Sequence, residues 1–405
     1  MMNLIRKNKS FRILLLFFIC NDSSVILLQM ANGWLTLSVT ESVFWTGGVF
    51  GVAGVGVVLF SLFGGVLADR MNRKKILQIT QPIDFCCAII LTFLIYFNLI
   101  KLWEILLIVF INGAIGGIRL PTREALLLDI VGRKNLLKAI SITFILFTIV
   151  GFCIPLINGI LIDINMSFVY LLSSILILLS FLFITRLNLS DRNYQLKKSP
   201  FGDLKEVFNY ILDKNIIKQI LFIILISEVF GWAHNSMIPV MIREVFKLPA
   251  TSLGVILSCG SVGAVVGTII ISQLSTKKNI SYMYMVFGLM GFGGFLILFG
   301  LSSHFYLAVF FLSIAWAFAF AFEVKIYAYL QMIISDSMRG RILSLLAMSY
   351  GLSSVSGFLS GFIGNVYGPR FAIVLFGIII VVSSFYAIFK LKKIDEEVPD
   401  LNENI

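Results

Sequence analysis

Long apolar runs separated by short polar connections dominate the chain. The runs fall at about 12–38, 43–68, 76–100, 103–130, 135–162, 167–187, 218–242, 251–274, 281–301, 304–333, 340–366 and 370–391. Each run is long enough to cross the hydrocarbon core of a bilayer as an α-helix, because roughly 20 apolar residues suffice for that. The pattern therefore predicts an all-α membrane protein with twelve transmembrane helices.

One long polar interval, 188–217, divides the predicted spans into two sets of six. The chain is accordingly expected to consist of an N-terminal half at 1–187, this cytoplasmic linker, a C-terminal half at 218–393 and a cytoplasmic tail at 394–405. The linker segment DLKEVFNYILDKN, beginning at Asp203, has apolar residues at helical spacing. That spacing predicts a helix lying along the membrane surface.

The composition agrees with lipid as the main solvent. Hydrophobic residues make up 59% of the 405 residues and charged residues 13%, about half the charged share of a typical soluble domain. The five cysteines lie inside apolar runs without metal-ligand spacing, so we interpret them as core residues and expect neither metal nor cofactor. The first run continues past Asp22 to about Val39 without a small-residue cleavage site, which favours a span over a signal peptide.

Basic residues are concentrated in alternate connections between the spans. The expected cytoplasmic connections hold most of them, whereas the opposite side carries only Lys101, Arg243, Lys247 and Arg370. Because basic connections stay in the cytoplasm, both termini are expected there, in a multi-pass protein of the bacterial inner (plasma) membrane. The net charge of +11 follows from this distribution, so it indicates lipid orientation and not nucleic-acid binding.

The sequence FGGVLADRMNRKKIL at 63–77 forms the connection between the second and third spans. Its residues Gly65, Asp69, Arg70 and Arg73 resemble the loop motif G-x-L-x-D-R-x-G-R-[RK] of the major facilitator superfamily. Asn72 stands where that family has glycine, and asparagine is the next-best residue for a left-handed turn, so the loop geometry is expected to persist. The resemblance implies that Asp69 and Arg73 help to close the cytoplasmic side of a transporter.

Two further stretches extend the resemblance over nearly the whole chain. LPTREALLLDIVGRKNLLKAIS at 120–141 and MIPVMIREVFKLPATSLGVILSCGSVGAVVGT at 237–268 are similar to the branch that includes macrolide efflux pumps and the enterobactin exporter. Asp129 in the first stretch, together with Asp336 and Arg341 after the tenth span, is assigned to the same cytoplasmic gate. The resemblance implies a fold of two six-helix halves related as a parallel repeat, with the substrate site between them.

Ionisable residues inside the spans mark the expected site, because each costs about 2.5–3.5 kcal/mol to insert. Asp22 and Glu228 lie near the midplane of the first and seventh spans, and Arg119 and Lys325 lie in the fourth and tenth. The members of each pair are 206 residues apart, which supports the repeat. We expect these four charges to face one another in a cavity that couples protons to substrate, and Glu323 is a further candidate proton carrier.

Several of these charges have simpler interpretations. Asp84 could pair with Arg119 as a static strut or take part in transport, and the sequence leaves both open. Arg123 is interpreted as reaching the cytoplasmic interface by snorkelling. His234, six residues after Glu228 on an ideal helix, is interpreted as a polar residue at the outer mouth of the cavity and not as a proton carrier.

The fifth span contains GFCIPLING, with Gly151, Pro155 and Gly159 at a spacing of four. This resembles the antiporter motif G-x-x-x-G-P-x-x-G-G of exporting branches, although Ile154 replaces the glycine before proline. Such spacing allows close helix approach and a bend. The eleventh span has glycines that correspond to this motif, and the same role is expected of them; they are Gly357, Gly361 and Gly364.

These features favour a proton-coupled secondary exporter of an amphipathic small molecule, either a macrolide-like drug or a siderophore. Uptake or facilitated transport of a metabolite is an alternative, because nothing in the sequence fixes direction. An intramembrane enzyme is disfavoured, since the chain has two histidines, no metal-ligand spacing and no phosphate-binding loop. A receptor or scaffold would gain nothing from buried charges. The expected partners are substrate, protons and lipid, and the protein is expected to be a monomer.

Overall fold

The computed structural model describes residues 2–187, 210–274, 282–334 and 336–397. Helices account for nearly all of these residues, and no β-strand occurs within the described ranges, so the all-α prediction is confirmed. The expected linker falls mainly outside them. Of the surface helix predicted there, residues 210–213 are described, and they are helical.

The first half consists of six helices. They are α1 (Met2–Lys7), α2 (Lys9–Thr40), α3 (Val43–Arg70), α4 (Arg73–Tyr96), α5 (Leu102–Ile164) and α6 (Met166–Thr185). Helix α5 is 63 residues long and contains both the fourth and the fifth predicted spans. A single non-helical residue, Gly132 with φ 70°, separates the two parts, because glycine alone adopts such an angle without strain.

The second half begins with an irregular helix in place of the regular seventh span expected from the sequence. Its segments are α8 (Asn215–Ile226), the π-helical η1 (Ser227–Gly231), the 3₁₀-helical η2 (Trp232–Met237), α9 (Ile238–Val240) and the π-helical η3 (Met241–Val245). The remaining helices are α10 (Ala250–Leu274), α11 (Tyr282–Leu301), α12 (Phe305–Ile333), α13 (Asp336–Tyr367) and α14 (Pro369–Glu397).

Ten helices or helical stretches of the described chain are long and apolar enough to cross a membrane. This number differs from the twelve expected spans for two reasons. Helix α5 counts once although it covers two predicted spans, and α13, which coincides with the eleventh, is not among the ten. The order and positions of the apolar helices otherwise agree with the sequence pattern.

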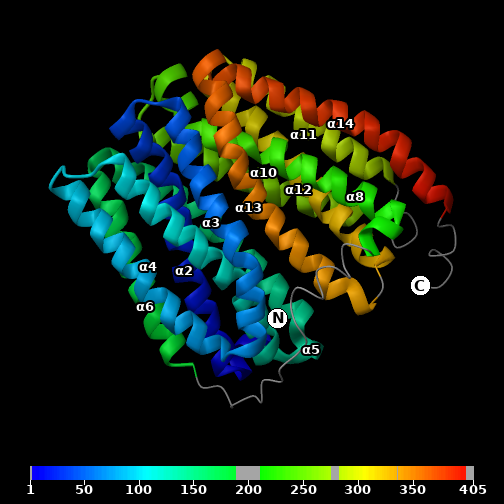
Figure 1. Ribbon diagram of the computed structural model, residues 1–405, viewed down its shortest axis with the longest axis horizontal. Helices are drawn as coiled ribbons and strands as arrows, with labels where there is room; N and C mark the ends of the chain where they lie inside the picture. Colours follow the sequence, from blue (N-terminus) through cyan, green and yellow to red (C-terminus); the bar gives the residue numbers. More distant parts are fainter. Residues whose placement is uncertain (1, 188–209, 275–281, 335, 398–405) are drawn as a thin grey trace.

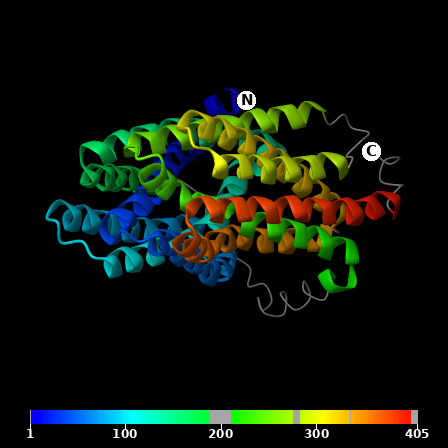
Figure 2. The ribbon, with the colours of Figure 1, turned by 90° about the horizontal axis from the view of Figure 1, so that it is seen from above.

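The helices run lengthwise beside one another (Figure 2), and two interfaces join the halves. Helix α3 packs on α13, and α5 packs on α10. Both contacts depend on glycine: a Cβ added to Gly361 would lie 2.6 Å from the Phe44 carbonyl oxygen, and one on Gly159 would lie 2.6 Å from that of Ala250. The glycines of the eleventh span thus allow close approach of α13 to α3, as Gly159 of the fifth span allows close approach of α5 to α10.

Hydrogen bonds from the start of α10 to Asp163 hold the α5–α10 interface together at the C-terminal end of α5. One carboxylate oxygen of Asp163 accepts a hydrogen bond of 2.8 Å from the Ala250 N–H, and the other accepts one of 2.8 Å from the Thr251 N–H. This side chain thus caps α10 from the opposite half. At the other end, α3 and α13 diverge toward the part of the bundle where the N-terminus lies (Figure 1).

Candidate functional site

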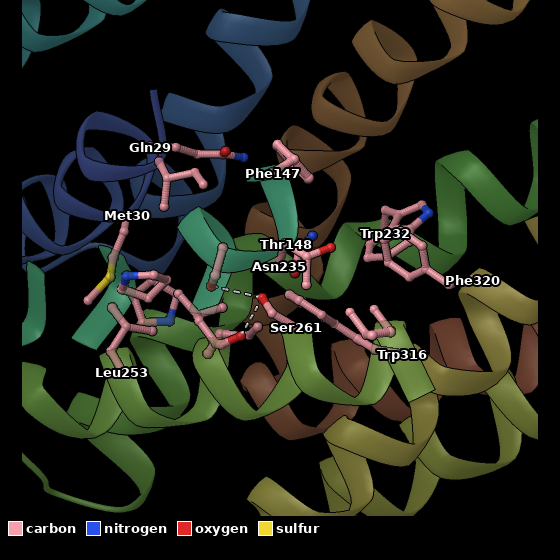
Figure 3. A pocket seen from close by; sticks show the side chains of 18 of the residues that line it. Gln29, Met30, Phe147, Thr148, Trp232, Asn235, Leu253, Ser261, Trp316 and Phe320 are labelled. Carbon is pink, nitrogen blue, oxygen red and sulfur yellow. Dashed lines mark hydrogen bonds between the residues drawn. The ribbon is translucent and has the colours of Figure 1, made fainter. Parts of the chain in front are cut away.

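A cavity of about 250 Å³ lies between the two halves. Figure 3 shows side chains converging on it from α2, α5, the irregular seventh span, α10 and α12. Among the described residues that line it, none is charged, and aromatic side chains are prominent; they are Phe50, Phe144, Phe147, Trp232, Trp316 and Phe320. Its wall therefore offers mainly apolar and π surfaces to a ligand.

Both hydroxyl groups among the described lining residues have partners. The Thr148 hydroxyl donates to the Phe144 carbonyl oxygen at 3.0 Å. The Ser261 hydroxyl lies 2.9 Å from the Gly151 carbonyl oxygen, which ties α10 to α5. The side-chain oxygen of Asn235, by contrast, is buried and has no hydrogen-bond partner among the described residues. A ligand that donates a hydrogen bond could satisfy it.

The two indole N–H groups of the wall bond to groups behind it. Trp232 donates to a carboxylate oxygen of Glu323 at 2.8 Å, and Trp316 donates to Nε2 of His234 at 3.0 Å. His234 Nδ1 in turn donates to the Gly231 carbonyl oxygen at 2.5 Å. This arrangement requires a neutral imidazole protonated on Nδ1.

His234 is 0% exposed and packs among aromatic rings. The expectation that it lines the outer mouth is therefore wrong. The prediction counted six residues along a regular α-helix, but the chain between Ser227 and Met237 is π-helical and then 3₁₀-helical. These turns change the angle between successive side chains, so regular counting fails here.

The buried acids of the first half are paired with arginines. Asp84 on α4 bonds to Arg119 on α5 at 2.5 Å, with both side chains at most 10% exposed, so this pair has the geometry of the strut. Asp22 on α2 accepts two bonds from Arg123, at 2.5 and 3.2 Å. The guanidinium also lies 4.2 Å from the centroid of the Phe18 ring. The snorkelling expected of Arg123 is therefore wrong, because a bidentate partner holds it inside the bundle.

The acids inside the spans of the second half are arranged differently. Glu228 in η1 accepts a 3.1 Å bond from the Tyr327 hydroxyl, and its other carboxylate oxygen is buried and has no hydrogen-bond partner among the described residues. Glu323 on α12 is half-buried and accepts from Trp232. Within the described ranges, neither acid forms an ion pair.

Lys325 also lacks an acidic partner among the described residues, and its ammonium group lies 5.7 Å from the centroid of the Tyr284 ring. The four repeat-related charges consequently do not face one another in the described cavity, and none of them lines it. Asp22 and Arg119 have separate partners within the first half. Glu323 comes closest to the cavity, through Trp232.

The connection between α3 and α4 is organised around Arg73. Its guanidinium donates to the carbonyl oxygens of Ala68 and Ala125, each at 3.0 Å, and pairs with Asp129 at 2.5 Å. The motif thus ties the start of α4 to the end of α3 and to α5. Arg70 is exposed, and the side chains of three other expected gate residues lie outside the described part: Asp69, Asp336 and Arg341.

Two details of the motif differ from expectation. Asn72 has φ −61° and not a left-handed angle, because its side chain caps α4 by accepting from the N–H groups of Lys74 and Lys75. A Cβ added to Gly65 would meet nothing within 4 Å, whereas one on Gly64 would lie 2.6 Å from the Gly117 carbonyl oxygen. The close helix approach therefore requires the first glycine of the pair.

The fold and this central cavity define a membrane transporter of the major facilitator type. Residues 5–403 match the family described as transmembrane secretion effector, and the chain belongs to that family. It is 22% identical to the staphyloferrin A transporter of Staphylococcus aureus over 91% of this chain and 94% of that protein. A 26% match to an uncharacterized transporter of Buchnera aphidicola covers 42% of this chain and 43% of that protein.

Solved structures show the same fold. A bacterial homologue of the human lysosomal transporter Spinster, in an inward-facing and unoccupied conformation, has a TM-score of 0.76 at 14% identity, covering 94% of this chain and 96% of that one. A nucleoside transporter has a TM-score of 0.75 at 16% identity, covering 94% and 98%. Together with the family match, these structures confirm the predicted superfamily.

Proposed function

We propose that the protein is a secondary active exporter, which moves an amphipathic small molecule out of the cell in exchange for protons by alternating access. The family's description as a secretion effector supports outward transport. The capped α5–α10 interface and the divergence of α3 and α13 toward the other end support a cavity loaded from the cytoplasmic side. The charge distribution along the chain supports a cytoplasmic position for both termini and for the Arg73 motif.

The observation that carries proton coupling is the pair of acids behind the cavity wall. Glu228 and Glu323 hydrogen-bond to uncharged donors and, within the described chain, form no ion pair. Acidic residues inside membrane spans that lack a compensating cation are characteristic of proton relays in transporters. One of them contacts the cavity through Trp232, so proton binding and substrate binding occur close together.

The cavity wall supports an aromatic or otherwise amphipathic substrate. Indole and phenyl faces line it, and the unpartnered oxygen of Asn235 suits a substrate with a hydrogen-bond donor. A siderophore is the second candidate, because the staphyloferrin A transporter is similar over most of its length. An anionic siderophore would need a basic contact that the described wall does not provide, so we favour the amphipathic substrate.

Reconstituted proteoliposomes with an imposed pH gradient test this function. Uptake of the aromatic dye ethidium into proteoliposomes, measured by fluorescence, should follow the gradient and collapse with a protonophore. Glu228→Gln should reduce the rate of gradient-driven uptake at least tenfold, because an amide cannot load and release a proton. A tenfold decrease corresponds to about 1.4 kcal/mol in activation free energy. Glu104→Gln is the same chemical change at a residue whose carboxylate accepts a hydrogen bond of 2.6 Å from the Lys101 N–H. This variant should transport normally.

Gradient-independent uptake by the wild type would contradict proton coupling. Uptake of staphyloferrin A should be measured in parallel. Gradient-driven uptake of this compound without uptake of ethidium would favour the siderophore, and uptake of neither would contradict both substrate classes.

A further inference from the structure

Trp232 and Trp316 form adjacent parts of the cavity wall, yet their N–H groups bond to different kinds of acceptor. The ring centroids are 5.7 Å apart. Trp232 bonds to a carboxylate, that of Glu323, whereas Trp316 bonds to the neutral imidazole of His234. One indole is therefore held by a carboxylate, which loses its charge when it binds a proton. The other is held by an imidazole that is 0% exposed among aromatic rings, where a positive charge would be costly.

We propose that Trp232 is a positioning residue, which transmits the protonation state of Glu323 to the cavity and thereby sets the affinity for aromatic substrate. With Glu323 ionised, the indole is fixed with its face toward the cavity. When Glu323 binds a proton, the indole is released and the substrate is held less tightly. This inference rests on the proposed function, because it assumes that an aromatic molecule occupies this cavity.

The strength of the Trp232–Glu323 bond is the physical basis of the effect. A hydrogen bond to an ionised acceptor is roughly twice as strong as one between neutral groups. The two oxygens of protonated Glu323 are also no longer equivalent, because one of them becomes a donor whereas the indole N–H needs an acceptor. A small proton-dependent change at Glu323 is thus converted into a change at the surface that the substrate contacts.

The packing around Trp232 allows that change to spread through the wall. Its ring lies 5.6 Å from the ring of Phe320, which also lines the cavity, and 5.8 Å from that of Phe292. Trp316 is more constrained, because a Cβ on Gly260 would lie 2.8 Å from its ring. The backbone of α10 at Gly260 therefore restricts the Trp316 ring independently of any proton. Trp316 is for this reason a suitable control.

Protonation of other ionisable groups on the surrounding elements could also make binding depend on pH, and these groups must be distinguished from Glu323. Glu228 lies on η1 and His234 on η2, while Lys325 shares α12 and lies over Tyr284 of α11. Helix α8 also packs on α12 and carries Lys218. Helix α10 packs on α12 and contains no Asp, Glu, Lys, Arg or His. Of these groups, only Glu323 accepts a hydrogen bond from Trp232 in the described structure.

The test is equilibrium binding of ethidium to the purified, full-length protein in nanodiscs, measured from acidic to alkaline pH. For the wild type we expect affinity to fall by about tenfold on acidification, the ratio that a change from a charged to a neutral acceptor can produce. Trp232→Phe keeps an aromatic ring but removes the N–H, so its affinity should vary by less than about twofold over the same range. Trp316→Phe should retain the wild-type dependence.

Glu323→Gln provides a second variant that leaves Trp232 intact, and its affinity should also be independent of pH. Tryptophan fluorescence without dye gives a separate signal: it should change with pH in the wild type and in Trp316→Phe, and be flat in Trp232→Phe and Glu323→Gln.

Full pH dependence of binding in Trp232→Phe would overturn the inference, while gradient-driven transport by the wild type would still support the proposed function. Absence of both pH-dependent binding and gradient-driven transport in the wild type would overturn both.

Discussion

The two halves of the molecule treat their buried acids in opposite ways. In the first half, Asp22 and Asp84 each bond to an arginine of α5. In the second half, Glu228 and Glu323 bond to uncharged tyrosine and tryptophan side chains. Asp22 and Glu228 are separated by the repeat distance of 206 residues, so similar positions have acquired different surroundings.

This difference indicates a division of labour between the halves. An acid paired with arginine has its charge compensated, and the pair holds two helices together. An acid that bonds only to neutral donors has no such partner and is available to carry a proton. We therefore infer that the charges of the first half serve structure and that those of the second half serve coupling.

The largest effect on stability is expected from breaking the Asp84–Arg119 pair. Arg119→Gln leaves a buried carboxylate without its cation, and removal of one partner from such a pair costs about 3–5 kcal/mol. Thermal unfolding of the purified variant, followed with a thiol-reactive dye, should show a clear decrease in melting temperature.

A double variant serves as the control for this effect. Adding Asp84→Asn removes the uncompensated charge and should restore much of the lost stability, since both partners are then neutral. A melting temperature unchanged by Arg119→Gln alone would show that the pair does not stabilise the first half. The inference that the charges of the first half serve structure would then be wrong.

An intermediate effect is expected at Arg123, whose bond to Asp22 is bidentate. Lysine keeps the charge of Arg123 but loses the planar fork and the stacking on Phe18. Arg123→Lys should therefore lower the free energy of unfolding by about 2 kcal/mol. The exposed Arg133→Lys is a matched control on the same helix, and an equal change in both variants would contradict a specific role for the Asp22–Arg123 bond.

The sequence predicted the class of fold because the information is local. An apolar run of sufficient length forms a spanning helix whatever its neighbours are, and the loop motif at 63–77 identified the superfamily. The prediction of the Asp84–Arg119 strut was one of two alternatives, since spacing along the chain cannot decide which of several helices a charge will meet.

What could not be predicted depends on contacts between distant segments. The pairing of Asp22 with Arg123 requires knowledge of how α2 lies against α5. The aromatic wall and its link to Glu323 depend on the π-helical and 3₁₀-helical turns around Trp232, which regular helical counting does not represent. The contact of Gly361 with α3 could not be predicted for a similar reason, because glycine spacing predicts close approach but not the identity of the approaching helix.

The smallest effect on stability is expected at Glu228, and it gives the sharpest test of the comparison. Glu228→Gln replaces a carboxylate by an amide of the same shape, whose oxygen can still accept from Tyr327. No described cation loses a partner, so the free energy of unfolding should change by less than about 1 kcal/mol. The equivalent change Asp22→Asn leaves Arg123 uncompensated and should cost about 3 kcal/mol. Melting temperatures of the two variants, measured side by side, should therefore differ although the chemical change is the same. Equal decreases would show that both acids are held by structural charge pairs, and the assignment of coupling to the second half would fail.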